Sequence, residues 1–163
     1  MKITKELSKF NNIKFHDKEH KYYLNGIKTK SVTGVIGEYK HPFDKEYWSQ
    51  KKADERNITQ EEILSEWKYK ADFSCEKGSV FHEYVENFLT NKLYPFPEHR
   101  VGSMLGGTDN MLECKEAVDK LKILFEKFYK DSFGKLIPVR AEIVVGDEEW
   151  GVTGMIDQLF FNE

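Results

Sequence analysis

The sequence predicts an α+β domain, with an α/β arrangement as the alternative. Short segments rich in Tyr, Phe, Ile, Val and Thr occupy the first 40 residues, helical periodicity follows, and two apolar runs come last. This order of strands, helices and strands is typical of a mixed domain. With 163 residues the chain can form one core but not two of ordinary size. We expect a single domain over residues 1–163, with a β-rich part at 1–40 and helices plus core strands at 41–163.

Composition excludes several classes of protein. Twelve Phe, eight Tyr and three Trp provide apolar area for a core, so the chain is not expected to be disordered. No run approaches the roughly 18 apolar residues of a membrane span, and the start lacks the apolar stretch of a signal peptide. We therefore expect a cytoplasmic protein without a membrane partner. Cys75 and Cys114 lack CxxC spacing and are expected to be reduced thiols.

Strands are expected first, in the segments NIKFHD, HKYYL and IKTKSVTGVI. Asn25-Gly26 separates the last two, and this dipeptide favours a type I′ turn because both central positions need a positive φ. The sequence therefore predicts a β-hairpin or a three-stranded meander within residues 1–40.

Two helices are expected next. Asp44 is a candidate N-cap for a helix that ends near Arg56. Thr59 and Glu62 have the spacing of a capping box and precede an apolar face. Gly78-Ser79 should interrupt this second helical pattern.

A further helix should begin at Ser79 and end near Asn91. The segment KLYPFPEHRVGSMLGG follows, and its prolines and glycines predict a loop, either a mobile flap or a surface crossover. The longest helix is expected over about 109–133, with an apolar core stripe and Gly134 at its C-terminus. LIPVRAEIVV and VTGMIDQLFF should then form a hairpin of central, mostly buried strands.

Two carboxylates interrupt this last pair of strands. Asp157 lies within GMIDQLFF and Glu142 within VRAEIVV, so antiparallel pairing would bring them roughly opposite each other. Close carboxylates repel unless a cation or a proton lies between them. The alternatives are a turn or salt-bridge role for Asp157 and pairing of Glu142 with Arg140 or a lysine.

GSVFHEYVE sets His82 and Glu86 one helical turn apart, so that both project from one face. An imidazole nitrogen with carboxylate oxygens suits Mn²⁺ or Mg²⁺ better than the thiolate-rich sites of zinc. The alternative is a hydrogen-bonded core histidine. A zincin HExxH motif is excluded because position 86 is Glu, and the GxxxxGK[ST], GxGxxG and GxSxG motifs are absent from the sequence.

Several segments together resemble the RecB-like exonuclease branch of the PD-(D/E)XK nuclease superfamily, especially its small phage and bacterial members. They are YYLNGIKTKSVTGVI, FDKEYWSQKKADERN, GSVFHEYVE as G-x-x-x-H-x-x-x-E, AEIVV, and GVTGMIDQLFF as G-x-x-D. The resemblance spans about Phe15 to Phe161 and implies a restriction-endonuclease-like core. It implies that His82 and Asp157 bind Mg²⁺ or Mn²⁺, and that Asp157, Glu86 and Glu142 serve the metal-dependent hydrolysis of DNA phosphodiester bonds.

The sequence departs from this family after Asp157. The family has (D/E)-x-K on the next strand, whereas the sequence ends at Glu163 without that triplet. We expect a partial nuclease domain that is inactive or feeble by itself. A sheet without its next strand would have an unpaired edge, which favours self-association.

The competing hypothesis is a non-catalytic nucleic-acid-binding or assembly module with the same fold. Residues 1–52 carry twelve Lys against six Asp or Glu, a net charge of +6, while the remainder carries −9. Lysines with nearby Tyr and Trp could bind phosphates and stack on bases. We expect Lys28, Lys30, Ser31 and Thr33 to contact DNA; the alternative is that these lysines only solvate a β-rich segment.

Overall fold

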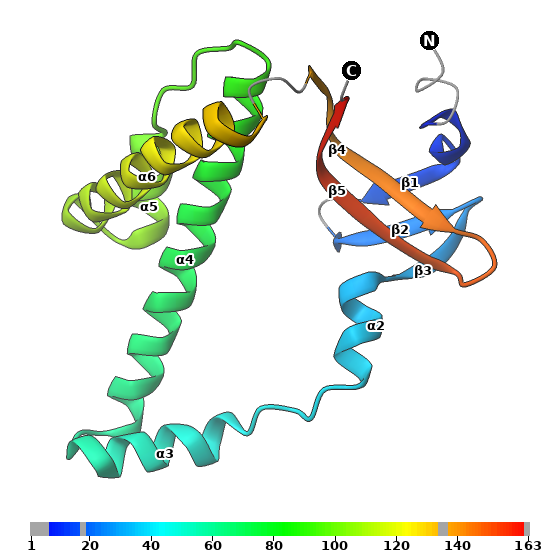
Figure 1. The fold of residues 1–163 in the computed structure, drawn as a ribbon. Helices are drawn as coiled ribbons and strands as arrows, with labels where there is room; N and C mark the ends of the chain where they lie inside the picture. The colour runs from blue at the N-terminus through cyan, green and yellow to red at the C-terminus, as the bar shows by residue number, and fades with distance from the viewer. Residues whose placement is uncertain (1–6, 17–18, 134–136, 162–163) are drawn as a thin grey trace. The chain divides into compact units, whose positions relative to one another are not determined.

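The computed structural model describes residues 7–16, 19–133 and 137–161, which form a sheet and a set of helices (Figure 1). Contacts divide the chain into two compact units. The β unit comprises 1–42 and 136–163, and the helical unit comprises 43–135. The strands at the two ends of the sequence therefore share one sheet, and the mixed α+β class is confirmed.

A three-stranded meander opens the β unit. Its strands β1 (Ile13–His16), β2 (Lys21–Leu24) and β3 (Ile27–Ser31) pair antiparallel in sequence order. Asn25 and Gly26 join β2 to β3 with φ of 52° and 80°. The predicted hairpin turn is confirmed, because both residues occupy the left-handed region that such a turn requires.

The last part of the predicted third strand is helical instead. Helix α2 (Val32–Glu38) follows β3 directly, and its N-cap Ser31 accepts a hydrogen bond from the backbone N–H of Gly34 at 3.0 Å. A serine cap satisfies an N–H group that the first turn leaves unpaired. This local hydrogen bond outweighs the β preference of the valines in SVTGVI.

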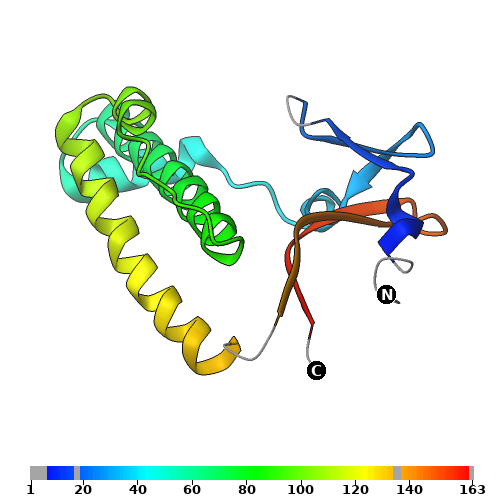
Figure 2. The same cartoon turned by 90° about the horizontal axis from the view of Figure 1, so that it is seen from above.

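The predicted C-terminal hairpin forms from β4 (Ile137–Asp147) and β5 (Val152–Phe161). The prediction that both strands of this hairpin are central in the sheet was wrong for one strand. The strand order is β1-β2-β3-β5-β4, so β5 lies inside the sheet and β4 at one edge. Figure 2 shows the hairpin from above, with the meander beside it. Burial is also limited, because Ile143 is the one hydrophobic residue of the hairpin that is buried among those described.

Helices α3 (Lys45–Arg56) and α4 (Gln60–Leu89) begin where the sequence predicts. Asp44 caps α3 by accepting a hydrogen bond from a backbone N–H at 2.9 Å. Thr59 and Glu62 form the capping box of α4, with each side chain bonded to the other's backbone N–H. These caps satisfy N–H groups that have no intrahelical acceptor.

The break expected at Gly78-Ser79 is absent, because α4 continues through both residues. A glycine within a helix costs only about 1 kcal/mol relative to alanine, and tertiary packing readily offsets this. Val80, which follows directly, is fully buried. The expected loop was also wrong in part, since residues Glu98–Leu105 form helix α5.

Helix α6 (Thr108–Phe128) ends in a π-helical turn, η3 (Tyr129–Phe133). It lies beside the C-terminal half of α4 (Figures 1 and 2), where Phe125 contacts the rings of Phe81 and Phe88. The core of this unit contains Val80, Val101, Leu105, Met111, Cys114 and Val118.

The predicted core stripe of α6 is only partly buried, because Leu112, Leu124 and Phe128 are each more than half exposed. The predicted Gly134 cap lies outside the described residues. Of the helices that the structure describes, none combines the length and the apolar character needed to cross a membrane.

Candidate functional site

Glu142 of β4 and Asp157 of β5 lie opposite each other on paired strands. The flanking pairs are Ala141↔Gln158 and Ile143↔Ile156, so the register places Glu142 and Asp157 at opposing positions of the two strands. The predicted pairing of these positions is therefore confirmed. Both side chains are exposed, which removes the expected cost of burying a carboxylate among apolar residues. Their carboxylates are accessible to a ligand from solvent.

The backbone at Glu142 is irregular. Its φ is +49°, in a region that residues other than Gly, Asn and Asp rarely adopt. The register of β4 against β5 also shifts between Pro138 and Arg140. Such irregularities bend a strand and re-aim its side chains, and they persist only where surrounding structure holds them.

Glu142 lines a hollow of about 900 Å³ within the β unit, which we call the Glu142 hollow. Ser31 and Thr33 line the same hollow, so three of the predicted site residues lie together. The other residues that line the hollow are Phe15, His20, Tyr22, Val32, Val145, Gly154 and Met155. The hollow thus combines a carboxylate, two hydroxyls and an imidazole with aromatic walls.

His20 was not predicted as a site residue, because no local motif marks it. Its φ of 50° is unusual, and its ring makes an edge contact with Phe15 at a centroid distance of 5.2 Å. Tyr22 forms another part of the wall, and burial raises the pKa of its phenol. The turn between β1 and β2 brings His20 toward Glu142, which lies more than a hundred residues later in the sequence.

His82 and Glu86 project from one exposed face of α4, as their spacing predicts. The alternative of a buried core histidine is wrong, because the imidazole is exposed. The neighbouring Tyr84 and Phe88 instead pack against Phe125 of α6. Both residues of the pair are thus available to a ligand on the surface of the helical unit.

Glu83 lies between His82 and Glu86 in the sequence but has a structural role. It accepts a hydrogen bond from Arg100 at 2.7 Å and another from the hydroxyl of Tyr94. Arg100 also donates to Glu76 at 2.9 Å, and the pKa of the Arg100 guanidinium is raised by its bond to Glu83. This network joins α5 and the preceding segment to α4, so Glu83 is not the catalytic base of a zincin-like site.

The four predicted acid and imidazole residues form two pairs in different units. Glu142 and Asp157 belong to the β unit, and His82 and Glu86 to the helical unit. Within the described part of the chain, no group of three or more His, Cys, Asp and Glu side chains is arranged to hold a metal ion. The donor chemistry nevertheless fits Mg²⁺ or Mn²⁺, because it consists of carboxylate oxygens and an imidazole nitrogen.

The predicted nucleic-acid contacts fall into two sets. Ser31 and Thr33 line the Glu142 hollow, and their hydroxyls lie 3.1 Å apart. Lys28 and Lys30 alternate with Thr29, whose side chain points to the other face of β3 and contacts Thr153 at 2.9 Å. The two lysines therefore lie on the face of β3 opposite to the packed one.

Comparison of the chain with models of protein families, with curated proteins and with solved structures found no significant match. The resemblance to RecB-like nucleases accordingly stays a prediction from the motifs.

Proposed function

We propose that the chain forms part of a metal-dependent DNA nuclease, exonuclease-like in type, built on a restriction-endonuclease-like core. The observation that carries this proposal is the apposition of Glu142 and Asp157 on adjacent strands. Two carboxylates at opposing positions of neighbouring strands favour a bound cation, because a cation relieves their repulsion. The Glu142 hollow next to them provides hydroxyls that can donate to phosphate oxygens.

In this proposal Asp157 and His82 bind Mg²⁺ or Mn²⁺, Glu142 completes the carboxylate pair, and Glu86 supports the site from the same face of α4. When bound, the ion would polarise the phosphoryl group and lower the pKa of water. Ser31 and Thr33 position the phosphate by donating hydrogen bonds to it. The sharing of one ion by these residues is part of the proposal.

Cleavage of linear DNA in the presence of Mn²⁺ or Mg²⁺ tests the proposal. We expect slow cleavage that EDTA abolishes and that Asp157→Asn or Glu142→Gln lowers roughly 100-fold or more, as for loss of a catalytic group. Glu149→Gln, in the exposed turn after β4, is the matched control and should leave the rate unchanged. Cleavage that neither site substitution alters contradicts the proposal, whereas complete absence of cleavage would fit a chain that is inactive by itself, as the sequence predicts.

Self-association is a second part of the proposal. β3 pairs with β5 at the beginning of β5 alone, through Lys30↔Val152 and Ser31↔Thr153. The side of β5 away from β4 has no further strand partner among the described residues, and such an edge favours pairing with another strand. Light scattering over a range of concentrations should show dimers, and Ile156→Lys on β5 should shift them to monomers. A monomer at all concentrations contradicts this part.

A non-catalytic nucleic-acid-binding module is the second candidate function. The net charge of +6 on residues 1–52 favours it, because phosphate contacts by lysine dominate non-specific binding. DNA binding that weakens with salt but ignores both EDTA and Asp157→Ala, without any cleavage, would select this candidate.

A further inference from the structure

The solvent-facing side of the β1–β3 meander is unusually basic. Side chains alternate between the two faces of a strand, so every second residue shares a face. The pairs Lys14↔Tyr23, His16↔Lys21 and Tyr23↔Lys28 assemble one such face across the three strands, and Lys30 extends it along β3. We call this set the lysine face; it consists of Lys14, His16, Lys21, Tyr23, Lys28 and Lys30.

The opposite side of the meander faces the interior of the β unit. It contains Ile13, Tyr22 and Leu24, which are buried, and Phe15 and Thr29, which are half-buried. Four members of the lysine face are exposed, whereas Lys21 and Tyr23 are half-buried. The strands thus separate an apolar side, which lines the Glu142 hollow, from a cationic side.

Nearby carboxylates neutralise only part of the positive charge on the lysine face. Glu19 binds Lys21 and Glu38 binds Lys30, each at 2.7 Å. Lys14 and Lys28 make no ion pair with any other described residue. Both lie directly across from Tyr23, on the two strands that flank it. Neighbouring strands lie about 4.8 Å apart, so the strands that carry Lys14 and Lys28 lie roughly 10 Å from each other. The strand that carries Tyr23 lies between them.

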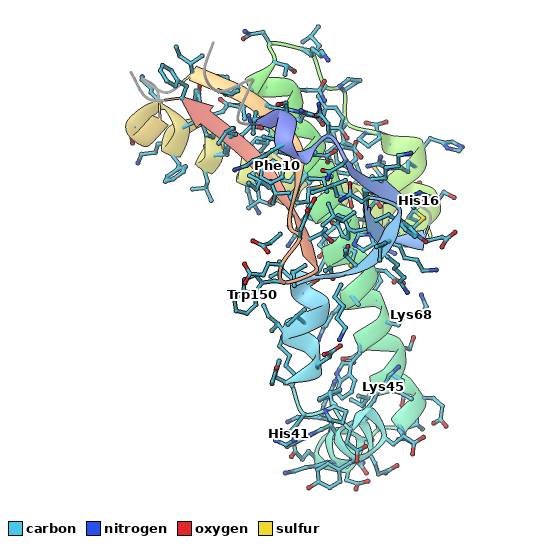
Figure 3. The ribbon with its side chains drawn as sticks, turned by 90° about the vertical axis from the view of Figure 1, so that its right-hand side faces the viewer. Phe10, His16, His41, Lys45, Lys68 and Trp150 are labelled. Carbon is cyan, nitrogen blue, oxygen red and sulfur yellow. The ribbon has the colours of Figure 1, made fainter. Side chains whose placement is uncertain are left out.

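Aromatic rings occupy the centre of this face. The rings of Tyr23 and His16 lie 4.8 Å apart between centroids, at an interplanar angle of 47°. His16 is exposed at the C-terminal end of β1 and is labelled in Figure 3. Cations beside partly exposed rings are the combination that binds single strands, because phosphates pair with the cations and unstacked bases stack on the rings.

We propose that the lysine face binds single-stranded nucleic acid, with phosphates on Lys14 and Lys28 and a base stacked on Tyr23. This surface is distinct from the Glu142 hollow, so the inference does not depend on the proposed hydrolysis; it names the surface and the ligand of the second candidate function. Single strands are favoured over a duplex because stacked base pairs do not offer a base face to Tyr23. They are favoured over an anionic membrane because the face presents rings between cations rather than an apolar side chain for insertion.

Fluorescence anisotropy with a labelled thymidine oligonucleotide, in EDTA, tests this inference without any contribution from a metal site. The logarithm of the affinity should fall linearly with the logarithm of the salt concentration, by about 0.7 per phosphate contact. The double variant Lys14→Glu/Lys28→Glu should bind at least about ten-fold more weakly with a shallower slope. Tyr23→Leu should weaken binding several-fold, whereas Tyr23→Phe, which retains the ring, should not.

The matched control is Lys92→Glu/Lys127→Glu, which makes the same change in net charge on the helical unit. This control should retain most of the affinity. Equal losses in the two double variants would overturn the inference, because net charge alone would then explain binding. Unchanged affinity of Lys14→Glu/Lys28→Glu with its circular dichroism intact, or binding to phosphatidylserine vesicles but not to the oligonucleotide, would also overturn it.

Discussion

Gly146 of β4 lies where three strands leave no room for a side chain. A Cβ atom at this position would lie 2.8 Å from Cγ2 of Thr153 and 2.9 Å from Cδ1 of Ile13, with the Val152 carbonyl oxygen at 3.2 Å. Thr153 is 1% exposed, and its hydroxyl lies 2.9 Å from that of Thr29. This close contact joins the β4–β5 hairpin to the N-terminal meander.

Gly146→Ala should therefore lower the free energy of unfolding by about 1–3 kcal/mol, because the added methyl group overpacks the contact. Urea unfolding followed by circular dichroism measures this change. Gly37→Ala in α2 is the control, since nothing lies within 4 Å of its added Cβ. Equal stability of the Gly146 variant and the wild type would contradict the described contact.

The bond from Arg100 to Glu76 is the second residue-scale feature on which stability depends. The Glu76 side chain is only 10% exposed, while that of Arg100 is 41% exposed. Arg100→Leu should leave the Glu76 carboxylate buried without its cation and destabilise the helical unit by roughly 2 kcal/mol. Lys120→Ala breaks the exposed pair with Glu116 and should leave the free energy of unfolding nearly unchanged, because solvent screens an exposed pair. Similar losses of stability in both variants would contradict the greater importance of the partly buried pair.

Two tyrosines make the stability of the helical unit sensitive to alkaline pH. Burial, together with bonds to Glu126 and Glu83, raises the pKa of Tyr84 and of Tyr94. A raised folded-state pKa gives stability that is complete below the unfolded value, near 10, and is lost as the pH rises further. Thermal unfolding should show a melting temperature that falls above about pH 10, less steeply in Tyr94→Phe. A slope that this substitution leaves unchanged would contradict the role of Tyr94.

At the scale of elements, local signals in the sequence predicted the turn of the first hairpin and the starts of two helices. The Asn25-Gly26 turn and the caps at Asp44 and Thr59 are confirmed because each depends on a few adjacent residues. Predictions of element boundaries failed where packing between residues distant in the sequence determines the structure. Val80 is buried against α5 and α6, which keeps α4 continuous through Gly78, and no local pattern contains that contact.

Gly78→Ala should stabilise the protein by about 0.5–1 kcal/mol, because alanine loses less conformational entropy in a helix. The added Cβ meets nothing within 4 Å, so packing does not oppose the gain. Differential scanning calorimetry measures the shift in melting temperature. A lower melting temperature would indicate that α4 bends or breaks at this residue, as the sequence alone suggested.

At the scale of the whole molecule, the candidate site was predictable only within each unit. The opposing positions of Glu142 and Asp157 follow from the hairpin register. The helix face shared by His82 and Glu86 follows from helical periodicity. The Glu142 hollow was not predictable, because it joins the turn after β1, the start of α2 and the β4–β5 hairpin. No local pattern in the sequence links the pair on α4 to the pair on the hairpin.

Titration of Mn²⁺ into the full chain, followed by the electron paramagnetic resonance of the free ion, tests the central claim most directly. Ligands from both units should make His82→Ala and Asp157→Asn each weaken binding at least about ten-fold. The matched substitutions His99→Ala and Asp109→Asn, at exposed positions of α5 and α6, should leave affinity unchanged. Mn²⁺ binding that neither His82→Ala nor Asp157→Asn weakens, or no binding by the wild type, would contradict a shared metal site.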